Sequence, residues 1–331
     1  MSGEDRFVRR LLSEIPGSPR ILVGPGDDAA ILDGFPGPWA ISTDALVEGV
    51  DFLPEHPPEA VGRRAMAVNL SDLAAVGARP EFFLLTVGFP PERGEPFPLA
   101  VARGALSRAT PAGAGLAGGD LSRSPVAFVS IVVGGRLEGR ALRRSGARAG
   151  DLLFLSGFPG RAAAGLRLAS RNRSRGDAPG LSDADRAELL AAYLDPEPRL
   201  DLGRALAREG WATAAIDVSD GLGIDAGRLA EASGLRAVLE ADRLPIGAAL
   251  ASFAQREALD ARELALSGGD DYELLFAVAP ELEPQIPNTG PGDVPLTRVG
   301  RLEEGRGAVL RSAEGDREIG ALGYDHLGGA P

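Results

Sequence analysis

The sequence contains no cysteine and no lysine, and it has only two histidines, His56 and His326. The lack of cysteine excludes thiol nucleophiles, disulfides, zinc–thiolate sites and iron–sulfur clusters. Because every one of the 35 basic residues is arginine, a P-loop lysine, the strand lysine of protein kinases and Schiff-base chemistry are excluded as well. A Ser-His-Asp triad would need one of the two histidines. We interpret His56, which stands beside prolines, as a loop residue and His326 as a packing residue.

Basic residues are also outnumbered, since 47 acidic side chains give a net charge of -12. Nucleic-acid binding through a broad basic face draws its affinity from neutralising phosphates, so this balance disfavours a nucleic-acid partner. The first residues mix charges without an apolar core segment, and the longest apolar runs, such as 126–133, are far shorter than a membrane span. We therefore expect a cytoplasmic protein that binds neither nucleic acid nor membrane.

The chain has 331 residues, of which 44% are hydrophobic, and this length suggests two domains. Short runs rich in Val, Ile, Leu and Phe alternate with segments of helical periodicity, a pattern typical of an α/β or α+β fold. The Arg- and Gly-rich stretch 140–151 predicts a boundary, giving domains 1–140 and 141–331. Segments 172–185 and 280–295 are polar or proline-rich and are expected to be surface loops. The expected strands are 21–23, 39–42, 82–89, 126–133, 151–155, 214–218 and 274–278, and the expected helices are 59–76, 98–108, 161–168, 184–193, 199–208 and 222–232.

Aspartates recur where an apolar run meets Gly, Ser or Thr. The segments are GPGDDAAIL, ISTDAL, GLAGGD, AIDVSDGL and SGGDDYELLF, which place Asp27, Asp28, Asp44, Asp120, Asp217, Asp220, Asp270 and Asp271. Strand ends are where α/β proteins gather ligand groups. Clustered carboxylates repel one another unless cations lie between them, and hard oxygen ligands suit Mg²⁺, Ca²⁺ or Mn²⁺.

Each of these motifs alone is also typical of an ordinary turn or helix N-cap, because Asp beside Gly is common in both. Asp72 differs, since it interrupts the apolar helical segment NLSDLAAVG. An aspartate within a helix needs solvent or a partner.

Three pairs of glycines suggest that such metal ions would hold a phosphate group. Gly24 with Gly26, Gly118 with Gly119, and Gly268 with Gly269 permit close backbone approach and left-handed turns that can cradle phosphate oxygens. Neither GxxxxGK[ST] nor GxGxxG occurs at a strand-to-helix turn, so a nucleotide would be bound in another way. Arg143 and Arg144 would ordinarily be a solvated pair. Because the chain has no lysine, however, only an arginine side chain can offer a phosphate a permanent positive charge.

The ordered segments GPGDDAAIL, ISTDALVEGVDF, AVNLSDLAAVGARP, AGGDLSRSP, RALRRSGARAGDLLFLSG, AIDVSDGL, SGGDDYELLF and GYDHL together resemble the thiamine-monophosphate kinases of the AIR-synthetase-like superfamily. The resemblance runs from about Gly24 to Leu327. It implies ATP-dependent phosphorylation of thiamine monophosphate to thiamine diphosphate, the last step of thiamine diphosphate biosynthesis. It also implies an N-terminal α/β domain that binds ATP and magnesium and forms a homodimer, and a C-terminal α/β domain that completes the substrate site.

By the same resemblance, several Mg²⁺ ions are expected at Asp28, Ser42, Thr43, Asp44, Asp72, Asp120, Asp217 and Asp220. ATP is expected at Gly119, Asp120, Arg144 and Ser219, and the thiamine substrate at Asp51, Asp270 and Tyr324. No catalytic general base is expected. The acceptor is a phosphate monoester whose second pKa lies near 6, so it is already largely a dianion at neutral pH.

Other functions would produce parts of the same pattern. Selenophosphate synthetase and the hydrogenase-maturation carbamoyl dehydratase use a Cys or selenocysteine near one terminus, which this chain lacks. The purine-pathway synthetases share the fold, although the STD and SGGDDYELLF segments are closer to the kinase. A metal-dependent phosphatase would hydrolyse thiamine monophosphate without ATP, and a non-catalytic metal- or nucleotide-binding protein would show the same aspartates without turnover.

Overall fold

The computed structural model describes residues 37–170 and 180–324, with Ser13, Gly17 and two short strands before them. Those strands, β1 (Ile21–Val23) and β2 (Ile31–Leu32), pair antiparallel. The chain separates into two compact units, of which unit 1 comprises 1–73 and 78–138 and unit 2 comprises 74–77 and 139–331. No helix within the described ranges is long and apolar enough to cross a membrane.

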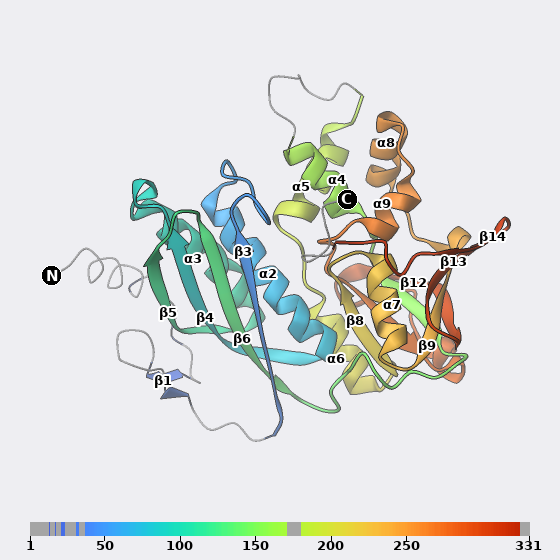
Figure 1. The fold of residues 1–331 in the computed structure, drawn as a ribbon. Helices are drawn as coiled ribbons and strands as arrows, with labels where there is room; N and C mark the ends of the chain where they lie inside the picture. The colour runs from blue at the N-terminus through green and yellow to red at the C-terminus, as the bar shows by residue number, and fades with distance from the viewer. Residues whose placement is uncertain are drawn as a thin grey trace. The chain divides into compact units, whose positions relative to one another are not determined.

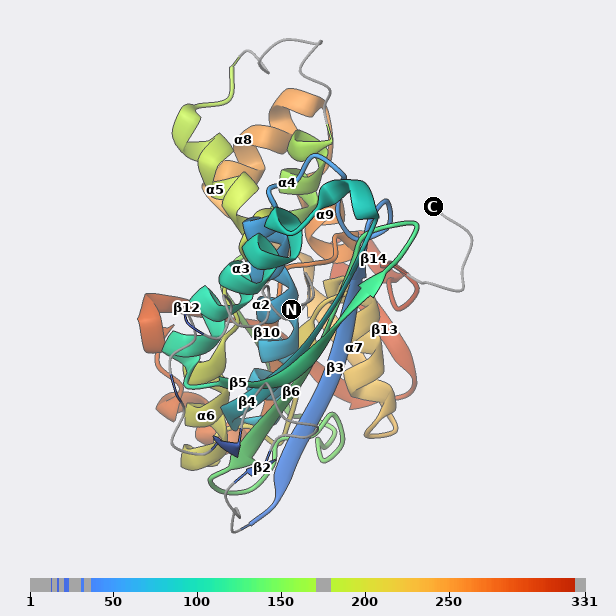
Figure 2. The ribbon, with the colours of Figure 1, turned by 90° about the vertical axis from the view of Figure 1, so that its left-hand side faces the viewer.

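Unit 1 is built on a four-stranded sheet in the order β3-β6-β4-β5, in which only β4 and β5 run parallel. Two long helices, α2 and α3, lie against one face of this sheet (Figure 1), and Figure 2 shows the same two layers after a quarter turn. The elements are β3 (Trp39–Val47), α2 (Pro58–Val76), β4 (Ala78–Phe89), the 3-10 turn η1 (Pro91–Arg93), α3 (Pro96–Ala112), β5 (Gly115–Arg123) and β6 (Phe128–Leu137).

Two glycines allow α2 and α3 to approach each other closely. A Cβ atom added at Gly62 would lie 2.0 Å from the carbonyl oxygen of Val101, and one added at Gly104 would lie 2.0 Å from that of Glu59. Helix backbones that touch in this way leave no space for a methyl group on either side. The contact is therefore reciprocal, and it fixes the position of α2, the helix that carries Asp72.

Unit 2 contains a second sheet in the order β14-β13-β9-β12-β7-β10-β8, with β11 paired to β12. Its only parallel pair along this path is β13 with β9. The strands are β7 (Leu152–Ser156), β8 (Ala214–Val218), β9 (Leu235–Glu240), β10 (Glu273–Val278), β11 (Thr289–Gly290), β12 (Val294–Glu304), β13 (Gly307–Ser312) and β14 (Gly315–Glu318).

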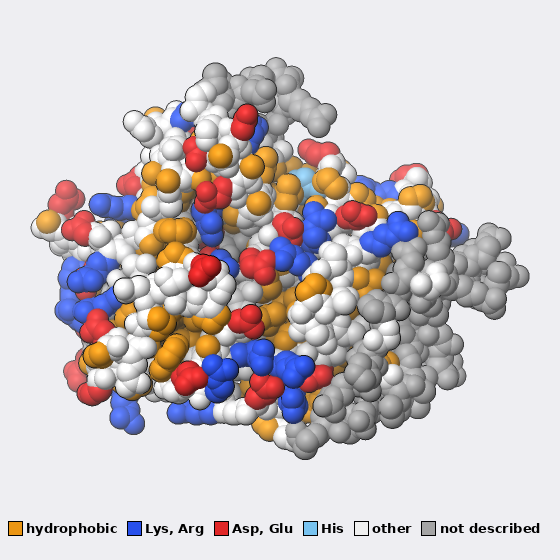
Figure 3. Space-filling model, turned by 180° about the vertical axis from the view of Figure 1, so that it is seen from behind, with side chains coloured by type: hydrophobic (Ala, Val, Ile, Leu, Met, Phe, Trp, Pro, Cys, Tyr) orange, Lys and Arg blue, Asp and Glu red, His pale blue; other side chains and the backbone are white. Residues whose placement is uncertain are grey.

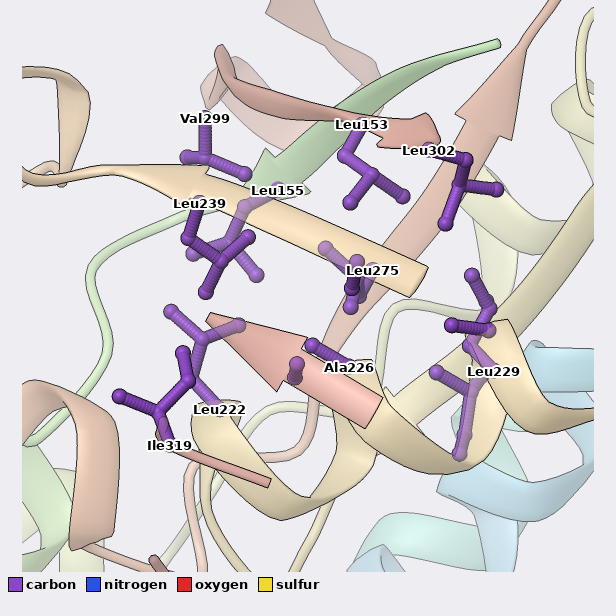
Figure 4. Packing of buried hydrophobic residues seen from close by; sticks show 14 of the residues in the cluster. Leu153, Leu155, Leu222, Ala226, Leu229, Leu239, Leu275, Val299, Leu302 and Ile319 are labelled. Atoms are coloured by element: carbon purple, nitrogen blue, oxygen red, sulfur yellow. The ribbon is translucent and has the colours of Figure 1, made fainter. Parts of the chain in front are cut away.

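The main core of unit 2 lies between this sheet and α7. Figure 4 shows Leu222, Ala226 and Leu229 of α7 directed at leucines of the central strands, such as Leu275. Leu275 and Leu222 are completely buried. The helices are α4 (Arg161–Ala169), α5 (Asp183–Leu194), α6 (Leu200–Glu209), α7 (Leu222–Glu231), α8 (Ala248–Glu257) and α9 (Ala261–Ser267), with 3-10 turns η3 (Ala241–Arg243), η4 (Pro280–Gln285) and η5 (Pro291–Asp293).

The expected α/β class is confirmed, whereas two local predictions need correction. Gly118 and Gly119 lie within strand β5 and not in a left-handed turn, whereas the close backbone approach expected of the pair is confirmed at Gly119, where β4 leaves no space for a side chain. The proline-rich segment 280–295, expected to be a loop, contains η4, β11, η5 and the start of β12. Pro280 and Pro291 lie at the starts of η4 and η5, and Pro295 lies at the beginning of β12, positions that tolerate a missing N–H.

Candidate functional site

Three segments that are far apart in the sequence meet in unit 2. The backbone N–H groups of Asp270 and Tyr272 donate to the carbonyl oxygens of Ser219 (2.7 Å) and Val218 (2.8 Å). Asp220 follows Ser219 directly, and its carbonyl oxygen accepts from the N–H of Tyr324 at 2.9 Å. The fold thus gathers the AIDVSDGL and SGGDDYELLF motifs and Tyr324 at the end of β8, with Ser219, Asp220 and Asp270 half-buried and Tyr324 exposed.

Asp225, which the sequence analysis missed, shapes the turn after β8. Its Oδ2 accepts from the backbone N–H groups of Ser219 (3.0 Å), Asp220 (3.0 Å) and Gly221 (3.2 Å). Burial raises the pKa of the Asp225 carboxyl, although the N–H of Asp220 and the charge of Arg228 act against this. A side chain in the first turn of α7 therefore folds back to hold the residues that precede the helix.

Arg228 connects this anchor to one of the predicted metal ligands. Its Nη1 donates to Asp225 Oδ1 at 2.7 Å and also to Asp220 Oδ2. Asp217, by contrast, lies inside β8, opposite Leu274 of β10, and is only 4% exposed. The Asp-x-x-Arg spacing of 225 and 228 on one helix face is the sequence signal that could have identified this pair.

The motif after α9 contributes two further carboxyl groups, those of Asp271 and Glu273, each of which has structural partners. Asp271 Oδ2 accepts from the N–H of Gly160 at 2.5 Å, and Oδ1 accepts from that of Ala162 at 3.2 Å, so this carboxyl caps the start of α4. Burial raises the pKa of Asp271 to about 8, and its two backbone donors oppose the change only in part.

Glu273 is the centre of a buried ionic cluster. Its two carboxylate oxygens accept from Nε and Nη2 of Arg199, each at 2.6 Å, and Oε2 also accepts from Ser156 Oγ at 2.6 Å. Arg161 Nη2 lies 3.4 Å from Oε1. Glu273 is completely buried, so the planar, two-bond pairing with Arg199 compensates for the cost of removing its charge from water.

In unit 1 the structure brings together two predicted metal ligands from different elements. Ser42 Oγ of β3 donates to Asp72 Oδ2 of α2 at 2.5 Å. Asp44 lies two residues further along β3, hence on the same face of the sheet, and it is exposed. Thr43 points to the opposite face and donates its hydroxyl to the carbonyl oxygen of Ile131 at 3.0 Å. The helix aspartate thus has the partner that its position requires.

The predicted ATP-contacting residues of unit 1 lie on the neighbouring edge strand β5. A Cβ atom at Gly119 would come within 2.0 Å of the carbonyl oxygen of Leu85, so glycine is required there by strand pairing itself. Asp120 is exposed, and its Oδ2 accepts from Ser122 Oγ at 2.8 Å. In the strand register Asp120 lies beside Thr86, which lies beside Ser130. These three residues are on the face of the sheet opposite to Ser42 and Asp44.

The remaining predicted residues have varied surroundings. Asp51 Oδ2 accepts from the N–H of Val47 at 2.8 Å and so closes the turn after β3, while Arg144 is exposed in unit 2. His56 lies in the turn before α2, as expected, and burial lowers its pKa. Asp28 and His326 lie outside the described residues.

Charges of both signs are interspersed over the described surface drawn in Figure 3. Across the described residues no group of three or more His, Asp or Glu side chains is arranged to hold a metal ion. A smaller set of hard oxygen donors, two carboxylates and a hydroxyl, lies on β3 and α2. Mg²⁺ is commonly bound through only one or two carboxylates, with phosphates and water completing its coordination. The donor set of Ser42, Asp44 and Asp72 therefore fits that ion.

Two family models match most of the chain. They describe the N-terminal domain of AIR synthase related protein, over residues 26–137, and its C-terminal domain, over 148–312. A thiamine-monophosphate kinase of Rhodopirellula baltica is 37% identical, covering 90% of this chain and 89% of the relative. The crystal structure of the thiamine-monophosphate kinase from Stenotrophomonas maltophilia K279a superposes with a TM-score of 0.80, at 38% identity, covering 92% of this chain and 94% of that one. A structure described as AaThiL complexed with AMPPCP and TMP superposes at 0.78 and 30% identity, covering 98% and 96%.

Proposed function

The chain belongs to the thiamine-monophosphate kinases of the AIR synthase related family, and we propose that it transfers the γ-phosphoryl group of ATP to thiamine monophosphate, forming thiamine diphosphate. The observation that carries this proposal is the similarity, along 98% of the chain, to a relative in complex with AMPPCP and TMP. Those two ligands have the chemistry of a nucleotide donor and a phosphate acceptor for a single in-line transfer.

The composition of the chain suits this reaction. The acceptor oxygen belongs to a phosphate monoester that is largely a dianion at neutral pH, so no protein group must remove a proton from it. The chain has no lysine or cysteine, and His56 is buried beside α2. The lack of these groups as general bases is therefore no disadvantage for this reaction. The difficulty of the reaction is the repulsion between two polyanions, which has to be overcome by positive charge and by positioning.

Magnesium, when bound, would neutralise phosphate charge and align the two substrates. We assign several ions to oxygen ligands on both faces of the sheet of unit 1 and in unit 2, namely Asp28, Ser42, Thr43, Asp44, Asp72, Asp120, Asp217 and Asp220. In unit 1, the hydroxyl of Ser42 holds the Asp72 carboxylate against β3, which keeps that carboxylate from rotating into solvent. In unit 2, Asp225 and Arg228 hold the turn that carries Asp220.

The substrates are assigned to further residues of the two domains, 1–140 and 141–331. ATP would contact Gly119, Asp120, Arg144 and Ser219, and thiamine monophosphate would contact Asp51, Asp270 and Tyr324. The backbone bonds that join 218–220, 270–272 and 324 support a common position for Ser219, Asp270 and Tyr324. A guanidinium such as that of Arg144 can meet phosphate oxygens with two parallel hydrogen bonds.

A homodimer is also proposed, with the sheet of unit 1 as its interface. Ile41 is 68% exposed and Leu84 is 36% exposed. Ser42 faces α2, so its neighbours Ile41 and Thr43 lie on the opposite face of the sheet. Val132 pairs with both Thr43 and Leu84, so Leu84 lies on that opposite face as well. A sheet face with exposed apolar side chains favours association. A cytoplasmic location stays a prediction.

The decisive test is an assay of the purified protein with ATP, Mg²⁺ and thiamine monophosphate, followed by chromatographic separation of the thiamine species. We expect thiamine diphosphate only when ATP and Mg²⁺ are both present, and none when EDTA is added. Release of thiamine without ATP would point to a phosphatase instead. Binding of ATP without formation of thiamine diphosphate would contradict the assigned acceptor and lead to a screen of other small acceptors.

A further inference from the structure

We propose that Tyr272 is a positioning residue that holds the Asp270 carboxylate in the orientation needed to bind thiamine monophosphate. This inference rests on the proposed function, because it assigns Asp270 to the substrate. Its direct observation is a hydrogen bond in which the Tyr272 hydroxyl donates to Asp270 Oδ1 at 2.9 Å. Tyr272 is 7% exposed, whereas Asp270 is only half-buried.

The backbone at both residues adopts a conformation that side chains rarely take. Asp270 has φ 69° and Tyr272 has φ 51°, and a bulky aromatic residue in this left-handed region is a true outlier. Glycine would adopt either conformation without strain. Such strain persists only where surrounding contacts fix it, and it is concentrated at functional positions. The side chains at 270 and 272 are therefore kept despite a conformational cost.

Contacts on both sides of the loop fix this conformation. The N–H groups of Asp270 and Tyr272 are bonded to Ser219 and Val218. The intervening Asp271 caps α4, and Glu273 is bound by Arg199. Asp271 and Glu273 thus anchor the loop through their side chains, and the bond from the Tyr272 hydroxyl to Asp270 Oδ1 shows that residues 270 and 272 lie together.

A tyrosine is well suited to hold a carboxylate in one orientation. Its ring has two side-chain torsions, so a buried ring loses little further freedom when its hydroxyl forms a bond, and a bond to an ionised group is stronger than one between neutral groups. Thiamine monophosphate carries a permanent positive charge on its thiazolium ring. A carboxylate already held in place would bind that cation without the cost of ordering it.

The test is Tyr272→Phe, which removes one oxygen atom, with steady-state kinetics for both substrates. We expect KM for thiamine monophosphate to rise about 10-fold while KM for ATP changes by less than about 2-fold. In an Asp270→Ala background, Tyr272→Phe should add less than about 2-fold, because the two residues act as a pair. Tyr193→Phe is the matched control, since Tyr193 is a buried tyrosine of α5, and it should leave both KM values unchanged.

The outcomes separate this proposal from the function on which it rests. If the wild-type chain forms no thiamine diphosphate, the proposed function is wrong. If the wild type is active but Tyr272→Phe keeps the wild-type KM for thiamine monophosphate, or raises both KM values equally, the positioning role is wrong. Full additivity of the two changes at 270 and 272 would overturn it too.

A second measurement uses the wild-type protein, so it tests the proposal even if the Tyr272→Phe variant does not fold. The chain has three tyrosines, so wild-type protein labelled with 3-fluorotyrosine gives three ¹⁹F resonances, which Tyr193→Phe and Tyr324→Phe assign. Thiamine monophosphate without ATP should shift the Tyr272 resonance and leave that of Tyr193 in place. A Tyr272 resonance that stays fixed while calorimetry shows the substrate to be bound would contradict the proposal.

Discussion

The hydroxyl of Ser42 on β3 donates to Asp72 on α2, across 30 residues of sequence. Asp72 interrupts an apolar helical pattern, and its position is explained by this bond and by its half-exposed surroundings. The bond also depends on the position of α2 on the sheet, and the close contacts with α3 at Gly62 and Gly104 help to fix that position. A side-chain hydroxyl, a helix position and two glycines thus act together to place one carboxylate.

Removal of the charge on Asp44 tests the assignment of this face of unit 1. Asp44→Asn keeps the shape of an exposed side chain on β3 but removes the charge that we assign to metal binding. We expect kcat for thiamine diphosphate formation to fall at least ~10²-fold, or roughly 3 kcal/mol of transition-state stabilisation, with an unchanged melting temperature. Asp201→Asn is the control, because that side chain is 79% exposed on α6. Turnover like that of the wild type at saturating Mg²⁺ would contradict the assignment.

Asp225 should be important for stability although it is not assigned to a substrate. Asp225→Ala leaves three backbone N–H donors at 219–221 without their acceptor. We expect the free energy of unfolding, measured in urea, to fall by about 2–3 kcal/mol. Asp183→Ala removes an exposed aspartate from the first turn of α5 and should change it by no more than about 0.5 kcal/mol. Equal losses in the two variants would show that Asp225 does not hold this turn.

The raised pKa of Asp271 predicts a pH dependence of stability. Its carboxyl has a pKa of about 8 in the folded chain against 3.8 ordinarily, so between these values the folded chain binds more protons than the unfolded chain. The stabilisation is complete below about pH 4 and is lost as the pH rises through 8. Relative to Asp271→Asn, the wild type should therefore lose unfolding free energy from pH 5 to about pH 8 and should level off by pH 9.

Urea titrations at five pH values across this range measure that difference. Asp260→Asn is the control, because Asp260 also caps a helix, α9, but lies at the surface. A wild type whose stability relative to Asp271→Asn is constant, or rises with pH, would show that the two backbone donors outweigh the burial of this carboxyl.

The ionic cluster at Glu273 predicts an asymmetry between single and double substitutions. Glu273→Gln leaves the guanidinium of Arg199 facing a neutral group in a buried position, and we expect a loss of about 3–5 kcal/mol in the free energy of unfolding. Replacing both partners, as Glu273→Leu with Arg199→Met, should cost much less. The exposed pair of Glu263 and Arg317 supplies the control, and Glu263→Gln should cost at most about 1 kcal/mol. A double variant as unstable as Glu273→Gln would contradict the expectation.

Long elements with regular periodicity could be predicted from the sequence. The expected helix 59–76 corresponds to α2 (Pro58–Val76), and the expected strand 214–218 coincides with β8. Strand β5 was missed because its glycines suggested a turn, although strand pairing excludes a side chain at Gly119. Strand β12 was missed because it begins beside prolines and carries charged residues that pair with neighbours, such as Arg301 with Glu303.

The candidate site was predictable in its parts and not in its assembly. The motifs around Asp217 and Asp270 could be recognised from their aspartates, but their pairing through Ser219 depends on β8 lying beside β10. Asp225 and Arg228 give only a weak helix-spacing signal. Tyr272 gives none, because a positive φ at an aromatic residue cannot be read from the sequence.

The order of strands in unit 1 has a consequence for the synthesis of the chain. Strand β3 has β6 as its only neighbour in the four-stranded sheet, and Thr43 lies 88 residues before its partner Ile131. At ribosomal rates of about 5–20 residues per second, β3 would emerge roughly 4–18 s before that partner exists. Throughout that interval a largely apolar strand would have open backbone groups on both edges, so β3 is a segment of the nascent chain that a chaperone could usefully protect.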